Sequence, residues 1–222
     1  MQLGEAVAES GRELRRRYLG ARPVWTAGST HEGEEDLVLD AHAALERAVR
    51  GALLVLVPRH PQRFEGVAAL LERRGLDFDR RGRSETVRPE AQVLLLDTMG
   101  ELMAFYAASD AAFVGGSLVP VGGHNLLEPA ALGVPVITGP YTQNGPEIAR
   151  LLIEAGGALE VADGAALAGA AGRLLADPVL REHMGESARR FVEARRGGLA
   201  RLLALIEPLL GPKAGPATDA AR

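Results

Sequence analysis

The sequence predicts an α/β protein built on a Rossmann-like, doubly wound parallel sheet. Short apolar runs rich in aliphatic and β-branched residues alternate with longer stretches whose apolar residues recur at helical spacing. The apolar runs are unbroken, which is typical of parallel strands buried on both faces. Such an alternation predicts βαβ units. We expect one domain over residues 21–210, with the α/β pattern ending near residue 176 and helices following it.

Six segments are expected to form the strands of this sheet. They are PVWTAG (23–28), ALLVLVP (52–58), QVLLLD (92–97), AAFVGG (111–116), VPVITG (134–139) and ALEV (158–161). Each has the length and the continuous apolar character of a central strand.

Between these runs, apolar residues recur every three or four positions, as on the inner face of a helix. The sets are Leu37, Ala41, Leu45 and Ala48, then Phe64, Val67, Ala68 and Leu71, then Ile148, Leu151 and Leu152. Pro178 marks an expected helix start, and Leu202, Leu203, Leu205 and Ile206 fall near the end of the helical region. The last segment, GPKAGPATDAAR (211–222), is expected to be a disordered tail.

Residues 1–20 are expected to form a linker helix, and the basic stretch SGRELRRRYLGAR (10–22) allows two interpretations. A basic helix can lie on anionic lipid. The apolar face of this stretch is thin, which favours a connector between domains with solvated arginines. We expect the connector.

The composition excludes several classes of function. The net charge of -4 argues against a nucleic-acid-binding protein, which needs a basic face to displace counterions from phosphates. The chain has no cysteine, so disulfides, thiolate metal sites and cysteine nucleophiles are excluded. No apolar run approaches the roughly 18 residues of a membrane span, and the first 20 residues carry charges throughout. We expect no membrane span in this chain and no cofactor.

Polar and glycine-rich loops follow five of the predicted strands. They are GSTHEGEE (28–35), PRHPQRF (58–64), DTMGEL (97–102), GGSLVPVGGHN (115–125) and GPYTQN (139–144). Ligands of open parallel sheets bind beyond the carboxyl ends of the strands, where backbone N–H groups of the following helices point outward. The five loops therefore predict a lined cleft along one edge of the sheet.

The turn GGHN is the best candidate for an anion site. Gly122 and Gly123 allow a ligand close to the backbone, and a helix beginning near Asn125 directs its free N–H groups and its dipole at an anion. A single phosphate fits such a turn. Neither G-x-x-x-x-G-K-[ST] nor G-x-G-x-x-G follows the first strand, which weakens the nucleoside-triphosphatase and NAD hypotheses. Glu128 either accepts hydrogen bonds from a ribose diol or only interacts with the helix dipole.

Two other loops carry histidine and charged side chains that are candidates for contacts with a ligand or a metal ion. Arg59 and His60 follow a buried strand and are expected to pair with an anion, with an ordinary surface turn as the alternative. His31 precedes Glu34 and Glu35, but the H-E-x-x-H zinc motif is absent. The two glutamates are expected to charge a helix start, and we expect no metal site.

The segments STHEGEE, PRHPQRF, DTMGELMAFYAASDAAFVGGSL and GGHNLLEPAALGVPVITGP resemble, in this order and spacing, the C-terminal domain of the 3-deoxy-D-manno-octulosonic acid (Kdo) transferases. These are GT-B-fold enzymes of lipopolysaccharide assembly. The resemblance covers nearly the whole chain, from about Arg22 onward. It implies transfer of Kdo from CMP-Kdo to a lipid A precursor (lipid IVA) at the cytoplasmic face of the bacterial inner membrane.

The family also has an N-terminal domain that binds the acceptor and associates with the membrane, and no segment of this sequence corresponds to it. We therefore expect one half of a GT-B fold, which binds the donor but is inactive by itself. No catalytic base is assigned, because the resemblance places the base in the N-terminal domain. Acceptor binding and membrane association are expected through that domain as well.

The resemblance implies contacts to each part of CMP-Kdo. The phosphate is expected at residues 122–125, the ribose at Glu128 and the cytosine at residues 98–100. The full set of expected substrate-binding residues is Ser29, Thr30, His31, Arg59, His60, Thr98, Met99, Gly100, Gly116, Ser117, Gly122, Gly123, His124, Asn125 and Glu128. A pocket rich in basic and N–H groups suits a doubly anionic donor. Two alternatives remain open: the donor domain of a UDP-sugar transferase or epimerase, and a nucleotide-binding module without a reaction of its own.

Overall fold

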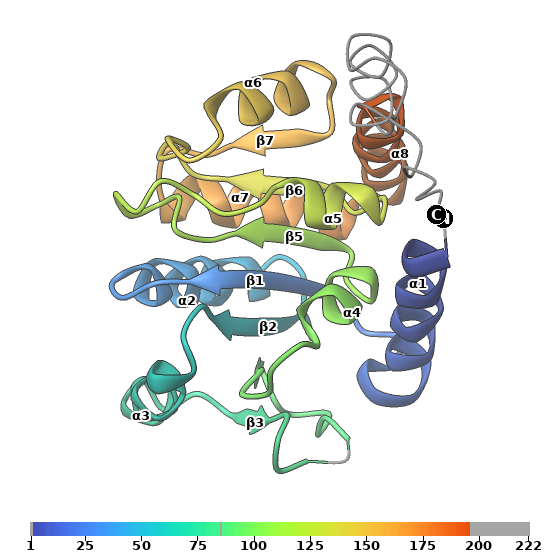
Figure 1. Ribbon diagram of the computed structural model, residues 1–222. Coiled ribbons are helices and arrows are strands. Elements are labelled where there is room, and N and C mark those ends of the chain that lie inside the picture. The colour runs from blue at the N-terminus through green and yellow to red at the C-terminus, as the bar shows by residue number, and fades with distance from the viewer. Residues whose placement is uncertain (1, 85, 196–222) are drawn as a thin grey trace, which may run out of the picture.

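The computed structural model describes residues 2–84 and 86–195 of the chain, which form a seven-stranded parallel sheet between layers of helices (Figure 1). The strands are β1 (Val24–Thr30), β2 (Leu53–Pro58), β3 (Phe78–Arg80), β4 (Val93–Leu95), β5 (Ala111–Val114), β6 (Val136–Thr138) and β7 (Ala158–Glu160). Their order across the sheet is β3, β4, β2, β1, β5, β6, β7, and every pair is parallel. The predicted doubly wound α/β fold is confirmed.

All six predicted strands are present, but the prediction missed β3, a short strand at the edge of the sheet. Two of its three residues, Asp79 and Arg80, are charged, so the segment lacks the apolar run that identified the other strands. Asp79 is nevertheless buried, and its carboxylate accepts hydrogen bonds of 2.7 Å from the backbone N–H and the Nε of Arg88. Ion pairing therefore replaces apolar burial at this edge.

Three helices, over residues 34–46, 64–73 and 146–154, occur where the apolar periodicity predicted them, whereas the helices over 102–107 and 164–176 were not predicted. The helices that the structure describes are α1 (Gln2–Leu14), α2 (Glu34–Glu46), α3 (Phe64–Arg73), α4 (Leu102–Ala107), α5 (Leu127–Ala131), α6 (Pro146–Glu154), α7 (Gly164–Ala176) and α8 (Pro178–Arg195), with a π-helical turn η1 (Arg15–Leu19) and a 3-10 turn η2 (Pro61–Arg63). Pro178 begins α8 as expected, whereas Ala48 lies beyond the end of α2. In the described part of the chain, no helix combines the length and the apolar composition of a bilayer span. The expected helices after residue 195 and the tail 211–222 lie outside the described residues.

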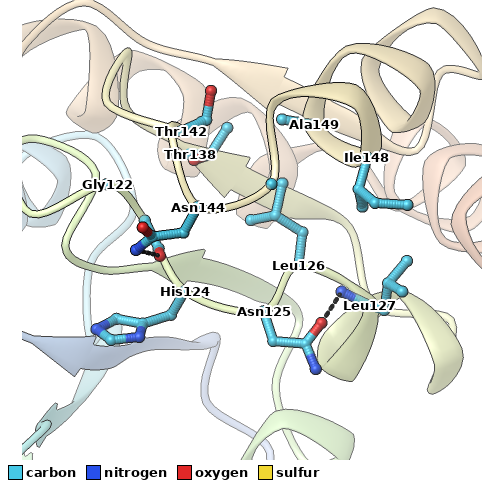
Figure 2. A pocket seen from close by; sticks show the side chains of 12 residues that line it. Gly122, His124, Asn125, Leu126, Leu127, Thr138, Thr142, Asn144, Ile148 and Ala149 are labelled. Atoms are coloured by element: carbon cyan, nitrogen blue, oxygen red, sulfur yellow. Dashed lines mark hydrogen bonds between the residues drawn. The ribbon is translucent and has the colours of Figure 1, made fainter.

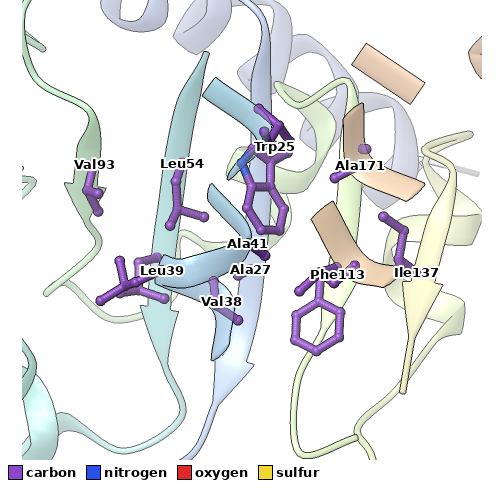
Figure 3. Packing of buried hydrophobic residues seen from close by; sticks show 14 of the residues in the cluster. Trp25, Ala27, Val38, Leu39, Ala41, Leu54, Val93, Phe113, Ile137 and Ala171 are labelled. Atoms are coloured by element: carbon purple, nitrogen blue, oxygen red, sulfur yellow. The ribbon is translucent and has the colours of Figure 1, made fainter. Parts of the chain in front are cut away.

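The core occupies both faces of the sheet, which explains why the strand segments are continuously apolar. In β2, Leu54 points toward the layer of α2, α3 and α7, and Leu53 points toward the layer that contains η1 and α4. Figure 3 shows the first cluster, in which Trp25 and Phe113 of the sheet lie near Ala171 of α7. On the opposite face, α5, α6 and α8 cover β5, β6 and β7.

The N-terminal segment is helical as expected, and it packs on the domain. α1 contacts α4, and Tyr18 and Leu19 of η1 are buried (Figure 1). Arg15 donates hydrogen bonds of 2.9 Å to the carbonyl oxygens of Ala108 and Arg22, and it pairs with Asp110 at 3.0 Å. The expectation of solvated arginines is therefore wrong for Arg15.

The centre of the sheet contains the reversal of strand order that creates a crevice in doubly wound folds. β1 and β5 are neighbours, and the chain continues from β1 toward β2 and from β5 toward β6. The helices that follow them, α2 and α5, lie on opposite faces. The two loops must therefore separate at the carboxyl edge, where ligands of this fold class bind.

Candidate functional site

The loops after β1 and β5 are joined by the buried carboxylate of Glu34, at the first position of α2. Its Oε1 accepts hydrogen bonds from the N–H groups of Ser117 (3.0 Å) and Leu118 (2.9 Å), and its Oε2 accepts from Gly116 (2.7 Å) and His31 (3.2 Å). Burial raises the pKa of Glu34, and the four backbone donors oppose that rise. The sequence prediction assigned Glu34 only to a helix start. Its role was missed because three of the partners lie more than 80 residues away in the chain.

Glu35 ties the same region to the loop after β2. The side chain is 1% exposed, and it accepts a hydrogen bond of 2.9 Å from the hydroxyl of Thr30 and a bidentate pair of bonds from Arg63. Thr30, an expected substrate contact, is fully buried, and its hydroxyl is used in this internal bond. Thr30 and Arg63 therefore support the loops by holding the Glu35 carboxylate in place.

Ser29 occupies a strained backbone conformation at the end of β1. Its φ of 58° is the one positive value among the non-glycine residues that the structure describes. The register between β1 and β2 shifts at this point, between Gly28 and Thr30. Strain of this kind costs on the order of 1 kcal/mol or more and is concentrated at functional sites. The neighbouring Gly115 cannot carry a side chain, because a Cβ there would lie 2.7 Å from both the Ser29 carbonyl oxygen and a carboxylate oxygen of Glu34.

Three histidines from three different loops meet above Gly116. The Nε2 atoms of His31 and His124 are 2.8 Å apart, with the ring planes 9° from parallel. His60 packs edge-on against His31, with ring centroids 5.6 Å apart. Burial lowers the pKa of His31, and burial together with the neighbouring His31 and Arg59 lowers the pKa of His124 to about 4. Within residues 2–84 and 86–195, no group of three His, Asp or Glu side chains is arranged to hold a metal ion.

The GGHN turn forms one wall of a cleft of about 390 Å³ (Figure 2). Other parts of the wall come from the β6–α6 loop and the start of α6, and the lining residues are Gly122, Gly123, His124, Asn125, Leu126, Leu127, Thr138, Thr142, Asn144, Gly145, Ile148 and Ala149. The side chain of Asn144 donates to the carbonyl oxygen of Gly123 at 3.0 Å, and its backbone N–H donates to that of Gly122 at 2.9 Å. Figure 2 shows the His124 ring pointing away from Ile148 and Ala149.

Thr142 and Asn144 were not among the expected site residues, although their loop was one of the five polar loops. Their signal in the sequence was weak, because a hydroxyl and an amide in a glycine-rich loop are equally common in ordinary turns. Contacts across the sheet edge distinguish them, since Asn144 fixes a turn formed more than 20 residues earlier.

A smaller cavity of about 90 Å³ is formed by the ends of β1 and β2 and the loop after β4. It is lined by Ser29, Val57, Pro58, Arg59, Phe64, Leu96, Thr98, Met99, Gly100 and Leu102. Met99 is 69% exposed at its rim. The Thr98 hydroxyl donates to Glu101, and although burial opposes it, hydrogen bonds from Arg81 and Thr98 lower the pKa of Glu101. The Thr98 side chain is thus anchored to Glu101, which in turn pairs with Arg81 at 2.9 Å.

The remaining expected residues make hydrogen bonds within the protein. Ser117 is fully buried; its hydroxyl donates to the Val114 carbonyl oxygen at 2.7 Å and accepts from the Gly139 N–H at 2.8 Å. Asn125 caps the short α5, because its side-chain oxygen accepts from the Leu127 N–H at 3.1 Å. Its amide donates to Glu128 at 3.4 Å. Ser117 is therefore committed to joining β5 and β6, while Asn125 and Glu128 remain partly accessible.

Comparison with known proteins identifies relatives over most of the chain. Residues 79–191 match the family model described as "Glycosyl transferases group 1". The 3-deoxy-D-manno-octulosonic acid transferase of Haemophilus influenzae is 48% identical over 198 residues, which are 89% of this chain and 46% of the relative. The enzyme of the same name from Bordetella pertussis is 42% identical over 212 residues, 93% of this chain and 50% of the relative. The chain thus spans about half the length of the curated relatives it matches.

Solved structures agree with this assignment. The crystal structure of the C-terminal CMP-Kdo binding domain of WaaA from Acinetobacter baumannii superimposes with a TM-score of 0.79 at 35% identity, covering 85% of this chain and 98% of that domain. HepE from Anabaena, solved with UDP and glucose, shares the fold with a TM-score of 0.63 at 19% identity, covering 92% of this chain and 52% of HepE. The expected half of a GT-B fold is confirmed. The chain belongs to the group 1 glycosyltransferases and, among them, to the Kdo transferase family, where it corresponds to the C-terminal domain.

Proposed function

We propose that this chain binds CMP-Kdo and acts as the donor domain of a Kdo transferase. The observation that carries the proposal is the joined pair of loops after β1 and β5, which brings the GGHN turn, the histidine cluster and Arg59 to one edge of the sheet. The likeness to a domain whose title says that it binds CMP-Kdo supports the choice of ligand.

The geometry suggests a place for each part of the donor. The phosphate lies against the backbone of residues 122–125. The N–H groups of Gly122 and Gly123 donate to the Gly116 carbonyl oxygen, so those of His124 and Asn125 face the phosphate. Glu128 accepts hydrogen bonds from the ribose diol. Cytosine lies at the small cavity of residues 98–100. Arg59 and the histidines face the anionic groups, and Ser29 and Arg59 both line the small cavity.

In this assignment the domain assists the reaction electrostatically. Cleavage of the glycosidic bond leaves negative charge on the departing CMP, and fixed N–H groups and cations stabilise that charge. The binding site for the acceptor, a lipid A precursor, and the general base belong to another part of the full-length enzyme. The curated relatives, which are about twice as long as this chain, contain such a further part. We propose that α1 and η1 connect the domain to that part, and that the complete enzyme works at the cytoplasmic face of the inner membrane.

A thermal-shift panel with CMP, UDP, GDP and NAD tests the proposed ligand. Binding to the folded state raises the melting temperature by mass action. CMP is expected to give the largest shift. Equal shifts for all four ligands contradict the assignment to cytidine. A shift with UDP but not with CMP indicates a UDP-sugar transferase or epimerase instead.

A further inference from the structure

Two imidazole rings meet where the loops after β1 and β5 converge. The Nε2 atoms of His31 and His124 are 2.8 Å apart, and the ring centroids are 5.0 Å apart. At this distance one nitrogen carries a proton and the other accepts it. The pair can exist as two neutral rings or as one cationic and one neutral ring. Two cationic rings would direct two donors at each other and break the bond.

Burial and the surrounding cations keep both rings of the pair neutral in the absence of a ligand. Burial lowers the pKa of both histidines, to about 4 for His124. Arg59 and His60, from the loop after β2, lower the pKa of His31 and His124 further, and Arg63 of η2 adds to this effect on His31. Both rings are therefore neutral at pH 7.

The nearby carboxylates are already engaged. Glu34 accepts four backbone hydrogen bonds, and Glu35, which raises the pKa of His31, is bound by Arg63 and Thr30. The loop of residues 115–125 contains no ionisable side chain other than His124. A further negative charge beside the pair must therefore come from a bound anion.

We propose that the His31–His124 pair takes up one proton when a phosphate monoester dianion binds beside it, so that binding of CMP is coupled to pH. The inference rests on the proposed function, which puts the phosphate at the turn that contains His124. An opposite charge within about 4–6 Å favours the cationic form by roughly one to three pKa units. A single added proton preserves the N–H···N bond and makes it charge-assisted, hence stronger.

Linkage between proton and ligand sets the expected pH dependence. Where the complex holds a proton that the free chain lacks, the affinity for CMP falls as the pH rises from 7 to 8, by at most about tenfold per unit. Over this range the phosphate of CMP, with a pKa of about 6, stays a dianion. Cytidine has no phosphate, and its binding is expected to be independent of pH.

The number of protons taken up per CMP is measured by isothermal titration calorimetry of the full chain at pH 7.5. The titration is repeated in buffers of different ionisation enthalpy. The wild-type chain is expected to take up a measurable fraction of a proton, and at most one, per CMP bound. His31→Gln and His124→Gln each retain a polar side chain, and both are expected to take up close to none. His183→Gln, a control at an exposed position of α8, is expected to match the wild type.

The outcomes separate this inference from the proposed function. CMP binding by the wild-type chain without proton uptake overturns the inference and leaves the proposed function intact. Undiminished uptake in both variants also overturns it, because the proton then resides on another group. Absence of CMP binding overturns the proposed function and the inference together. The wild-type proton count decides the matter even if both variants fail to fold.

Discussion

A buried carboxylate with four backbone donors cannot be replaced by its amide without loss. Each oxygen of Glu34 faces two N–H groups, so the amide nitrogen of a glutamine would face two donors in either orientation. The Glu34 carboxylate thereby fixes the spacing between His31 and the β5–α5 loop. Glu128 has a different environment. Its side chain is partly accessible, and it accepts a long hydrogen bond of 3.4 Å from the Asn125 amide.

Glu34→Gln is expected to lower the free energy of unfolding by about 2 to 4 kcal/mol, because two buried N–H donors lose their acceptor. Urea unfolding followed by circular dichroism measures this change. Glu154→Gln, in an exposed i,i+4 pair with Arg150, serves as the control and is expected to change stability by less than about 0.5 kcal/mol. Equal stability of both variants would show that the loops are held by other contacts.

Glu128→Ala is expected to leave the unfolding transition unchanged and to weaken CMP binding by about 1 to 3 kcal/mol, through loss of charged hydrogen bonds to the ribose. Calorimetric titration of the variant with CMP gives the value. Normal CMP affinity of this variant would show that Glu128 does not bind the ribose and acts only at the start of α5.

Helix α2 and strand β1 share a buried polar contact that makes stability depend on pH. Trp25 donates its indole N–H to His42 Nδ1 at 3.2 Å, and His42 Nε2 donates to the carbonyl oxygen of Gln92 at 3.0 Å. Both ring nitrogens are engaged by a neutral imidazole. Burial lowers the pKa of His42 to about 4 from its ordinary value of 6.5.

This shift predicts a loss of stability on acidification. Between pH 6.5 and 4 the unfolded chain binds a proton at His42 that the folded chain does not, so stability is full above pH 6.5 and falls as the pH falls. The loss reaches about 3 kcal/mol at pH 4. Urea unfolding over this range is expected to show a shallower pH dependence in His42→Gln than in the wild type, and identical slopes would contradict the assignment.

The regular elements were predictable because each β-strand in the interior is a continuous apolar run and each covering helix has one apolar face. β3 was not predictable from the sequence. Its Asp79 is buried as the partner of Arg88, and such ion pairing leaves no periodic pattern in the sequence. The glycine-rich loops predicted a cleft at the carboxyl edge of the sheet, and the structure has a cleft there that Gly122, Gly123 and Gly145 help to line. Glu34 and Asn144 escaped prediction because their partners are set by tertiary contacts.

The chain as a whole presents the GGHN turn and the histidine cluster at one edge of the sheet, and its curated relatives are about twice as long. We expect it to bind CMP yet transfer no Kdo by itself, because catalysis in a two-domain cleft requires both reactants in one geometry. Incubation with a CMP-Kdo regenerating system and a lipid A precursor, followed by mass spectrometry, tests this. Kdo-modified lipid from this chain alone would require a base here, and His60 or His124 would be the candidates, since Glu34 and Glu35 are engaged.

A crystal structure of the chain with CMP locates the phosphate directly. We expect its oxygens at the turn of residues 122–125, within hydrogen-bonding distance of the backbone N–H groups of His124 and Asn125, because those of Gly122 and Gly123 donate to Gly116. The ribose hydroxyls are expected at Glu128 and the cytosine beside residues 98–100. The His31 and His124 rings are expected to remain paired beside it. A phosphate bound elsewhere, such as in the groove between α2 and α3 that Arg63 and Arg73 line, would contradict a donor site at the junction of β1 and β5.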